Sequence, residues 1–396
     1  MKSHVHQMEK SISQCKSHDL GLRQIGHSGR QSGIEFLRVL CMFGIVASHY
    51  AIHGQWGGQV GFSPIGKWFL QFASIFGTFG VDVFVISSGY FLSEKHGLYP
   101  VSRLAKLEVS VYFHSLLPFL AILIAGGQRV VPSLWNLLGA TPALKAFFPV
   151  ISNQWWFITD YFVLCIFAPF VNRLLANLST REFAGLVLLE LLVFSILPTT
   201  FGHVLTGPDQ WFENRHVWFF VLYCAGAFVR RVQTGIPERQ TSFFAIAAAV
   251  CLAISWVGIA FCGVNIRGRQ QLPVIGAAVC SFLAFLRIDI GESRLLTTLS
   301  SSTLGVYLLH DHPLFRYTVW PTISDRFGGT DPFVFIPLSI LAISSVYAFC
   351  VVIESSINIL LRPATARSIR CLCSIETMLR HDSEVMQREQ PRKKDP

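Results

Sequence analysis

The chain has 396 residues, of which 52% are hydrophobic and only 14% are charged, and its mean hydropathy is +0.49. This composition excludes an ordinary soluble protein and is typical of an integral membrane protein. The formal net charge of +9 does not indicate nucleic-acid binding, because the basic residues are spread along loops and tails without forming a basic domain. We expect anionic membrane lipids to be their partners.

The apolar segments predict an all-α integral membrane fold, a bundle of about ten transmembrane helices. A spanning helix needs about 20 apolar residues, and ten segments approach this length. In chain order they are residues 34–52, 71–92, 107–126, 155–172, 183–201, 214–229, 242–263, 271–286, 299–319 and 332–361. The eighth segment is short for a span, and the tenth is long enough to tilt or break.

The distribution of Lys and Arg predicts the orientation of this multi-pass protein in the cell (plasma) membrane. Basic residues are retained on the cytoplasmic side, and both terminal tails are rich in them. The loops alone differ little, so the tails decide an N-in, C-in topology. We therefore expect a cytoplasmic polar tail at residues 1–33, a membrane domain at 34–362, and a basic, disordered cytoplasmic tail at 363–396.

The first predicted span carries an arginine and a histidine inside an apolar sequence. Arg38 and His49 are eleven positions apart, which at ~100° per residue places them on one helix face, about 16 Å apart along the axis. An arginine in a span costs roughly 2.5–3.5 kcal/mol on insertion scales and usually faces a bundle interior or a cavity. Glu35 is an i,i+3 partner that offsets part of this cost. Alternatively, Arg38 snorkels to the headgroups and His49 bonds a neighbouring helix.

Four segments together carry a resemblance to a known family. They are the Arg38 and His49 pair separated by ten residues, "GVDVFVISSGYFL" at 80–92, "NQWWFITDYFVLCIFAPFVNRLL" at 153–175 and "TLGVYLLHDHPLF" at 303–315. In this order they resemble the acyltransferase family 3 of integral membrane proteins, over roughly residues 34–361. The resemblance implies a membrane enzyme that O-acetylates a surface polysaccharide, so residues 34–362 would be a polytopic acyltransferase domain.

The resemblance also implies the donor. In the family it is acyl-CoA, usually acetyl-CoA, which is a substrate and not a bound cofactor. Family members often carry Arg-x-x-Arg before the third span, where this chain has Arg103 and Lys106. With Arg38, we expect them to bind CoA, although lysine lacks the bidentate geometry of arginine. Both residues could equally be topology anchors at the membrane edge.

His49 is the predicted general base, because a neutral imidazole can take the proton of an acceptor hydroxyl near neutral pH. Arg38 would hold the donor near its thioester or its phosphates. An alternative mechanism, in which His49 is transiently acylated, uses the same residues. Asp160 in the fourth span is predicted to orient the base, and Asp82 is a second intramembrane acid that could instead neutralise Arg38.

The acceptor is expected to bind on the outer side. The rings of Trp155 and Trp156 could stack on a sugar, and an interfacial aromatic belt is the alternative explanation for them. His310 matches the late histidine of the family and is assigned to the substrate site without a defined role. His310, Asp311 and His312 are too close in sequence at a helix end for good tetrahedral geometry, so we predict no metal.

These observations predict an O-acyltransferase that moves an acyl group, acetyl in the simplest case, from cytoplasmic acyl-CoA to a hydroxyl of a cell-surface or exported glycan. The sequence shows no fused extracytoplasmic domain, so we expect the chain to act alone or with a separate extracytoplasmic partner protein. The alternative is a polytopic transporter or flippase of a glycan or lipid-linked substrate. That alternative predicts inverted repeats with broken helices in matching halves, which the sequence does not show.

Overall fold

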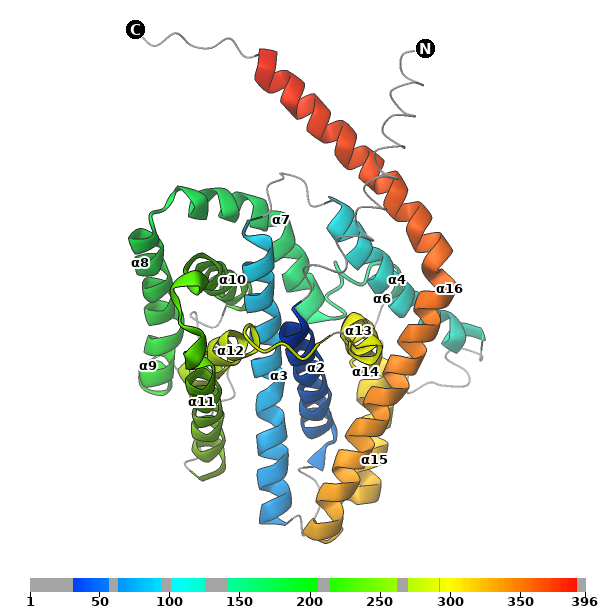
Figure 1. Ribbon diagram of the computed structural model, residues 1–396. Helices are drawn as coiled ribbons and strands as arrows, with labels where there is room; N and C mark the ends of the chain where they lie inside the picture. Colours follow the sequence, from blue (N-terminus) through cyan, green and yellow to red (C-terminus); the bar gives the residue numbers. More distant parts are fainter. Residues whose placement is uncertain are drawn as a thin grey trace.

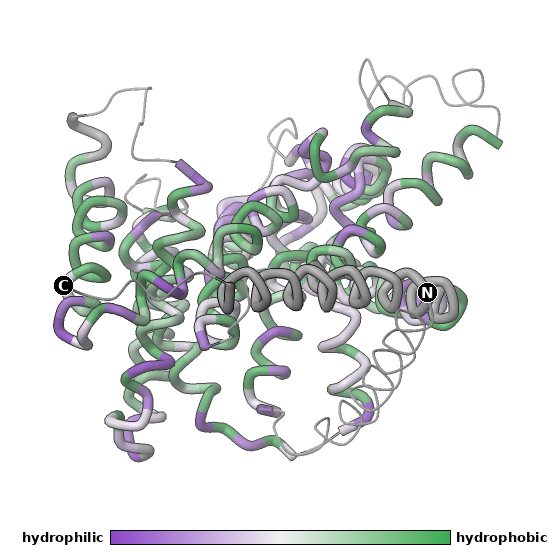
Figure 2. The backbone as a smooth tube through the Cα atoms, turned by 90° about the horizontal axis from the view of Figure 1, so that it is seen from above, coloured by the Kyte–Doolittle hydropathy of each residue, from purple (hydrophilic) through white to green (hydrophobic). Residues whose placement is uncertain are grey.

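The computed structural model describes residues 31–56, 63–94, 101–124, 142–205, 214–261, 270–291 and 293–389. All regular secondary structure in these ranges is helical, which confirms the predicted all-α class (Figure 1). The helices are mainly hydrophobic along their length (Figure 2). Six helices of the described part are long and apolar enough to cross a membrane. The predicted count of about ten spans and the N-in, C-in orientation remain predictions.

Eleven helices form the body of the structure. They are α2 (Ser32–His53), α3 (Pro64–Leu92), α4 (Val101–Ile124), α7 (Trp156–Asn177), α8 (Thr180–Leu191), α9 (Leu197–Leu205), α10 (Arg215–Val232), α11 (Thr241–Phe261), α12 (Leu272–Phe285), α14 (Thr303–His310) and α16 (Pro332–Glu389). Shorter segments connect them, namely α6 (Pro142–Phe147), the π-helical turns η3 (Leu192–Ile196) and η6 (Phe315–Val319), the 3-10 turns η4 (Gln233–Gly235) and η5 (Glu238–Gln240), α13 (Arg294–Ser301) and α15 (Trp320–Phe327).

Helices α2 and α3 form the centre of the bundle. More than half of their most apolar 18-residue windows is buried, 56% and 61%, against 17% for both the segment Thr180–Phe201 and α11. In Figure 1, α8, α9 and α11 lie on one side of the central pair and α16 on the other. The peripheral helices therefore present their apolar side chains outward, as helices in lipid do.

Glycine allows close packing of α3 against α10. A Cβ atom on Gly89 would lie 2.1 Å from the carbonyl oxygen of Tyr223, and one on Gly226 would lie 2.0 Å from that of Ile86. Helix backbones approach this closely in membranes only where small residues meet. The glycine of the "SSGYF" sequence is thus explained by packing, while its serines face a cavity described below.

The start of α2 is anchored to the loop after α12. The Ser32 hydroxyl donates to Asp289 Oδ1 at 2.7 Å and accepts from the Ile290 backbone N–H at 2.9 Å. The hydrogen bonds from Ser32 and from the Gly291 backbone N–H lower the pKa of the Asp289 carboxyl, because both favour its charged form. A side chain at Gly33 would collide with the Phe285 carbonyl oxygen at 2.2 Å. These contacts fix where α2 enters the bundle.

The predicted ninth span, residues 299–319, is not one helix. α14 ends at His310, a π-helical turn begins at Phe315, and α15 follows at Trp320. Pro313 lies between the first two elements and Pro321 at the start of the third. Proline lacks the N–H needed to continue a helix, so the prediction of a continuous span here was wrong. Asp311 and His312, the two residues of this break, are buried in the bundle.

The predicted disordered tail is also corrected in part. α16 continues to Glu389, through most of residues 363–396. This stretch contains Arg, Leu, Met and Glu, all good helix formers, and its only proline before residue 390 is Pro363. The high charge of residues 363–396 was the reason for predicting disorder. The helix propensity of these residues accounts for the helix that is observed.

Candidate functional site

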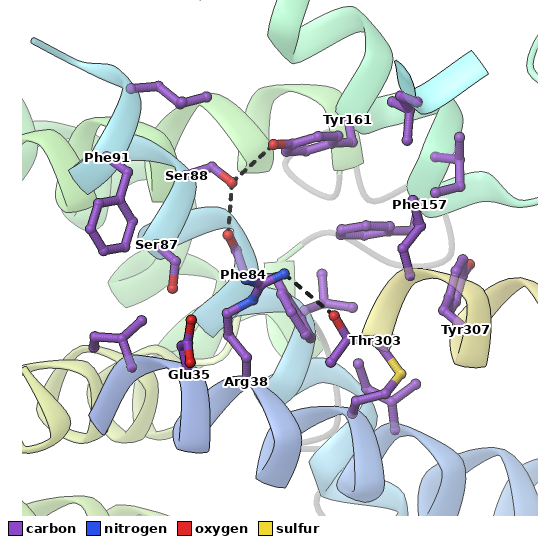
Figure 3. Close-up of a pocket in the computed structure, with 18 of the residues that line it drawn as sticks. Glu35, Arg38, Phe84, Ser87, Ser88, Phe91, Phe157, Tyr161, Thr303 and Tyr307 are labelled. Carbon is purple, nitrogen blue, oxygen red and sulfur yellow. Dashed lines mark hydrogen bonds between the residues drawn. The ribbon is translucent and has the colours of Figure 1, made fainter. Parts of the chain in front are cut away.

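A cavity of about 470 Å³ opens between α2, α3, α7 and α14, a size typical of small-molecule sites (Figure 3). Its walls are mostly apolar with a few polar groups. The lining residues are Gln31, Ile34, Glu35, Arg38, Met42, Ile45, Val81, Phe84, Ser87, Ser88, Phe91, Leu92, Leu107, Phe157, Ile158, Tyr161, Thr303, Leu304 and Tyr307. With Leu107 of α4, five segments far apart in the chain therefore combine to form one chamber.

Arg38 is the one Lys or Arg among the lining residues. Its Nη2 donates a long hydrogen bond of 3.3 Å to Thr303 Oγ1, and its guanidinium carbon lies 5.9 Å from the Phe84 ring centroid. Figure 3 shows this side chain reaching from α2 across the cavity toward Thr303. Glu35 also lines the cavity and interacts electrostatically with Arg38. The guanidinium nitrogens that Thr303 does not engage are able to bind a ligand carbonyl or anion.

The serine sequence of α3 forms a second polar edge of the cavity. Ser88 Oγ donates to the Phe84 carbonyl oxygen at 2.9 Å and lies 3.3 Å from Tyr161 Oη. The Tyr161 ring stacks on Phe157, with an interplanar angle of 9°. Figure 3 shows Ser88 and Tyr161 facing each other above Arg38. This edge supplies hydroxyl groups to a chamber whose walls are mostly apolar.

The predicted CoA-binding residues lie in the first turns of α4. Arg103 and Lys106 belong to this helix, but their side chains lie outside the described part of the structure. Leu107, the next residue, lines the cavity. The helix that carries both basic residues therefore reaches the cavity at Leu107, and their binding of CoA stays a prediction.

His49 lies just outside the cavity, beyond the end that is farthest from the start of α2. The cavity-lining residues of α2 run along one face from Ile34 to Ile45, and His49 is the next residue on that face, one turn or about 6 Å further. Tyr307 lines the cavity, and its ring centroid lies 6.5 Å from that of His49. The Tyr307 ring thus forms the wall between the chamber of Arg38 and the imidazole of His49.

His49 is held by a chain of hydrogen bonds. Its Nδ1 lies 2.9 Å from His310 Nε2, and His310 Nδ1 contacts the carbonyl oxygen of Val306. A carbonyl only accepts, so we assign the ring hydrogen of neutral His310 to Nδ1, which makes His310 Nε2 an acceptor. His49 Nδ1 must then donate, and its Nε2 keeps a lone pair. That lone pair is able to take a proton from a substrate.

Asp311 is the carboxylate beside this histidine pair. Its Oδ1 lies 3.5 Å from His49 Nδ1 and 3.9 Å from His53 Nε2, and it accepts from Arg316 Nη2 at 2.7 Å. Because Arg316 neutralises it, this buried carboxylate does not depend on a charged histidine. It favours the Nδ1–H form of His49 and would stabilise the imidazolium that proton transfer produces.

The same cluster has the close spacing of a metal site. One atom each of His49, His53 and Asp311 all lie within 4.8 Å of one another, close enough to surround an ion. However, Asp311 Oδ1 already binds the guanidinium of Arg316, and His49 Nδ1 already contacts His310. A guanidinium at the ligand atom repels a divalent cation, so the residues present fit a metal poorly. That no metal takes part remains a prediction.

The two predicted acidic residues have partners other than His49. Asp160 is fully buried, with its Oδ2 3.2 Å from Arg215 Nε and its Oδ1 3.0 Å from His216 Nδ1. Asp82 accepts from the indole N–H of Trp218 at 3.2 Å. The carboxylate that contacts the base is therefore Asp311, and Asp160 belongs to a separate cluster at the start of α10.

The two tryptophans of the predicted acceptor platform differ in exposure. Trp155 is 1% exposed and its ring lies 5.9 Å from that of His312, next to the histidine cluster. Trp156 is half-buried, and the guanidinium of Arg215 lies 5.8 Å from its ring centroid. Trp156 is thus the one of the two whose ring is partly open to a ligand at the surface.

Sequence reasoning missed Tyr307, Arg316 and the role of Asp311. Tyr307 stands inside the "YLLHDH" sequence, three residues before His310, on the same helix face. Arg316 follows Asp311 by five residues, across a proline that conceals any helical spacing. A buried acid next to a family histidine was the available signal, and a metal was the only role considered for it.

A family model described as an acyltransferase domain matches residues 31–355. This range contains the cavity, the histidine cluster and the Asp160 cluster. Neither the curated proteins nor the solved structures contain a match to the chain. The match supports membrane acyl transfer and does not favour the transporter alternative.

Proposed function

The chain belongs to the acyltransferase 3 family and is a membrane acyltransferase, and from this premise we propose that it transfers acetyl from acetyl-CoA to a hydroxyl of a surface or exported glycan. Arg38 and the start of α4 bind the donor on the cytoplasmic side. His49 acts as the general base toward the acceptor. The proposal places both substrates along one face of α2.

The observation that carries this proposal is the hydrogen-bond chain from His49 through His310 to the Val306 carbonyl oxygen. A histidine that merely fills space needs no fixed tautomer. Here the Nδ1 side is held by His310 and Asp311, and within the described residues Nε2 has no hydrogen-bond partner. This is the arrangement that general-base catalysis requires.

The proposed reaction needs few groups. The glycan hydroxyl gives its proton to His49 Nε2 while its oxygen attacks the thioester carbonyl carbon, and the carbon–sulfur bond then breaks. The CoA thiolate leaves and takes the proton from the imidazolium, so His49 returns to its neutral form. Arg38, which lies in the donor chamber, would orient the acyl-CoA. A transient acyl group on His49 is the alternative route through the same residue.

Tyr307 determines where the two substrates meet. Its ring separates the donor chamber from His49, and it packs against Phe157 at 5.6 Å between ring centroids. For transfer to occur, the thioester must pass the edge of this ring or the ring must turn aside. Tyr307 is therefore the side chain next to the reacting carbonyl in this proposal.

The proposal is tested with the full chain in lipid vesicles, using radiolabelled acetyl-CoA and a panel of candidate glycans. We expect label on a glycan with the parent chain, and a rate about 10²–10⁴-fold lower with His49→Ala, which is the usual contribution of a general base. Ile52→Ala, at an exposed position of the same helix outside the histidine cluster, is the matched control. Equal label transfer by the parent and His49→Ala would contradict the catalytic assignment.

A further inference from the structure

The N-termini of α7 and α10 meet in a charged cluster that the acyl-transfer step does not use. The Asp160 carboxylate is completely buried, and Arg215 and His216 contact one of its oxygens each, at 3.2 and 3.0 Å. The start of α10 is itself fixed, because the Asn214 side chain accepts from the His216 backbone N–H. Asp160 therefore ties two neighbouring basic side chains to one position.

Both basic side chains remain open to solvent. The Arg215 side chain is 32% exposed and the His216 side chain is 47% exposed. Asp160 occupies Nε of Arg215, and the two Nη groups have no hydrogen-bond partner among the described residues. The ion pair with Asp160 involves the Nε side of the guanidinium, so the two Nη groups are left to bind a carboxylate or phosphate.

An aromatic ring completes the cluster. The guanidinium of Arg215 lies 5.8 Å from the ring centroid of half-buried Trp156. An apolar ring beside a fixed cation suits a sugar that carries a negative charge, because the ring packs on C–H bonds while the cation binds the oxyanion. Trp156 alone would not distinguish an acidic sugar from a neutral one.

The cluster is connected to the proposed reaction site by the first turn of α7. Trp155 packs beside His312 with 5.9 Å between ring centroids, and Phe157 packs against Tyr307 at 5.6 Å. Trp156 stands between these two residues in the chain. A glycan bound at Arg215 would therefore lie next to the element that covers the histidine cluster.

We propose that Arg215, His216 and Trp156 form an acceptor subsite for an oxyanion of the glycan, the carboxylate or phosphate of an acidic sugar unit. This inference rests on the proposed function and adds the charge class of the acceptor. Asp160 is then a positioning residue, whose buried charge holds Arg215 and His216 at this position without touching the substrate. Binding here raises the affinity for acidic acceptors and leaves the acyl chemistry to His49.

The test compares three acceptors of one backbone, namely a hexuronic acid oligosaccharide, its carboxyl-reduced neutral form and a phosphorylated form of that neutral sugar. With the parent chain, we expect a KM for the charged forms about tenfold below that of the neutral form, the usual effect of a charge-assisted hydrogen bond. The lower of the two charged KM values identifies the anion. Equal KM values for all three acceptors would overturn the proposal.

Substitutions at Arg215 and His216 show whether these residues cause the lower KM for charged acceptors. Arg215→Gln is expected to raise the KM for the charged acceptor about tenfold and to leave the neutral acceptor and kcat unchanged. His216→Ala keeps the Asp160–Arg215 pair and is expected to give a smaller rise in the same direction. Exposed Arg181 at the start of α8 is the matched control as Arg181→Gln. A rise in KM of equal size for charged and neutral acceptors would contradict an anion subsite.

The rate of hydrolysis of labelled acetyl-CoA, measured without acceptor, distinguishes a failure of the anion subsite from a failure of the proposed function. Loss of charge discrimination in Arg215→Gln with unchanged hydrolysis and unchanged transfer to the neutral sugar supports the subsite. Transfer that persists without any charge discrimination in the parent overturns the subsite and leaves the proposed function standing. Absence of transfer from acetyl-CoA to every acceptor would overturn both.

Discussion

The two ends of α2 are built in opposite ways. Around Arg38 the structure has an apolar chamber of about 470 Å³, one hydrogen bond of 3.3 Å to Thr303 and an aromatic ring. Around His49 it has a packed cluster in which His310 and Asp311 contact the same ring nitrogen. A group with weak protein partners is ready for a ligand, whereas a group held on one side is prepared for proton transfer.

This difference assigns separate tasks to two residues of one helix. Substitutions at the Arg38 end should change the affinity for the donor, and substitutions at the His49 end should change the rate of the chemical step. If the two ends acted as one binding site, every variant would change both quantities together. The predictions below use this separation, starting with the largest expected effect.

His310→Ala is expected to lower kcat about 10²-fold, because His49 loses the partner that fixes its tautomer and orientation. Donor affinity should stay within about twofold of the parent, since His310 does not line the cavity. His310→Gln keeps an acceptor oxygen and should recover part of the rate. Steady-state kinetics on purified chains measures kcat, and an unchanged kcat in His310→Ala would show that the imidazole pair has no role.

Thr303→Val should have a small effect, confined to the donor. The substitution removes the acceptor of the 3.3 Å bond from Arg38, and a neutral hydrogen-bond partner of this kind contributes about 0.5–1.5 kcal/mol. We therefore expect the KM for acetyl-CoA to change about two- to tenfold while kcat is retained. Ser301→Ala, an exposed position on the preceding helix, is the control. A fall in kcat with an unchanged KM would contradict the separation of tasks.

The placement of Arg38 and His49 on one face of α2 could be predicted from the sequence, because it depends only on regular helix geometry. The eleven-residue spacing of Arg38 and His49 needs only an intact helix, and α2 runs without interruption from Ser32 to His53. The cavity follows that same face, from Ile34 to Ile45. Composition and apolar segments were sufficient for the helical class, because a lipid-exposed backbone must satisfy its own hydrogen bonds.

Contacts between distant segments could not be predicted in this way. His49 and His310 are 261 residues apart, and their contact depends on how α14 packs against α2. Asp160 was expected to orient the base, but its partners are determined by how the start of α10 packs on α7. A single sequence does not contain that packing, so the orienting carboxylate was assigned to Asp160, whereas in the structure Asp311 lies beside His49.

Equilibrium binding of labelled acetyl-CoA to the parent, Arg38→Met and His49→Ala tests the central claim most directly. We predict that Arg38→Met raises the Kd about tenfold or more, because a charge-assisted contact to the donor is lost. His49→Ala should bind the donor within about twofold of the parent while transferring label about 10²–10⁴-fold more slowly. Weakened donor binding in His49→Ala, or parent-like binding in Arg38→Met, would contradict the division of the two tasks along α2.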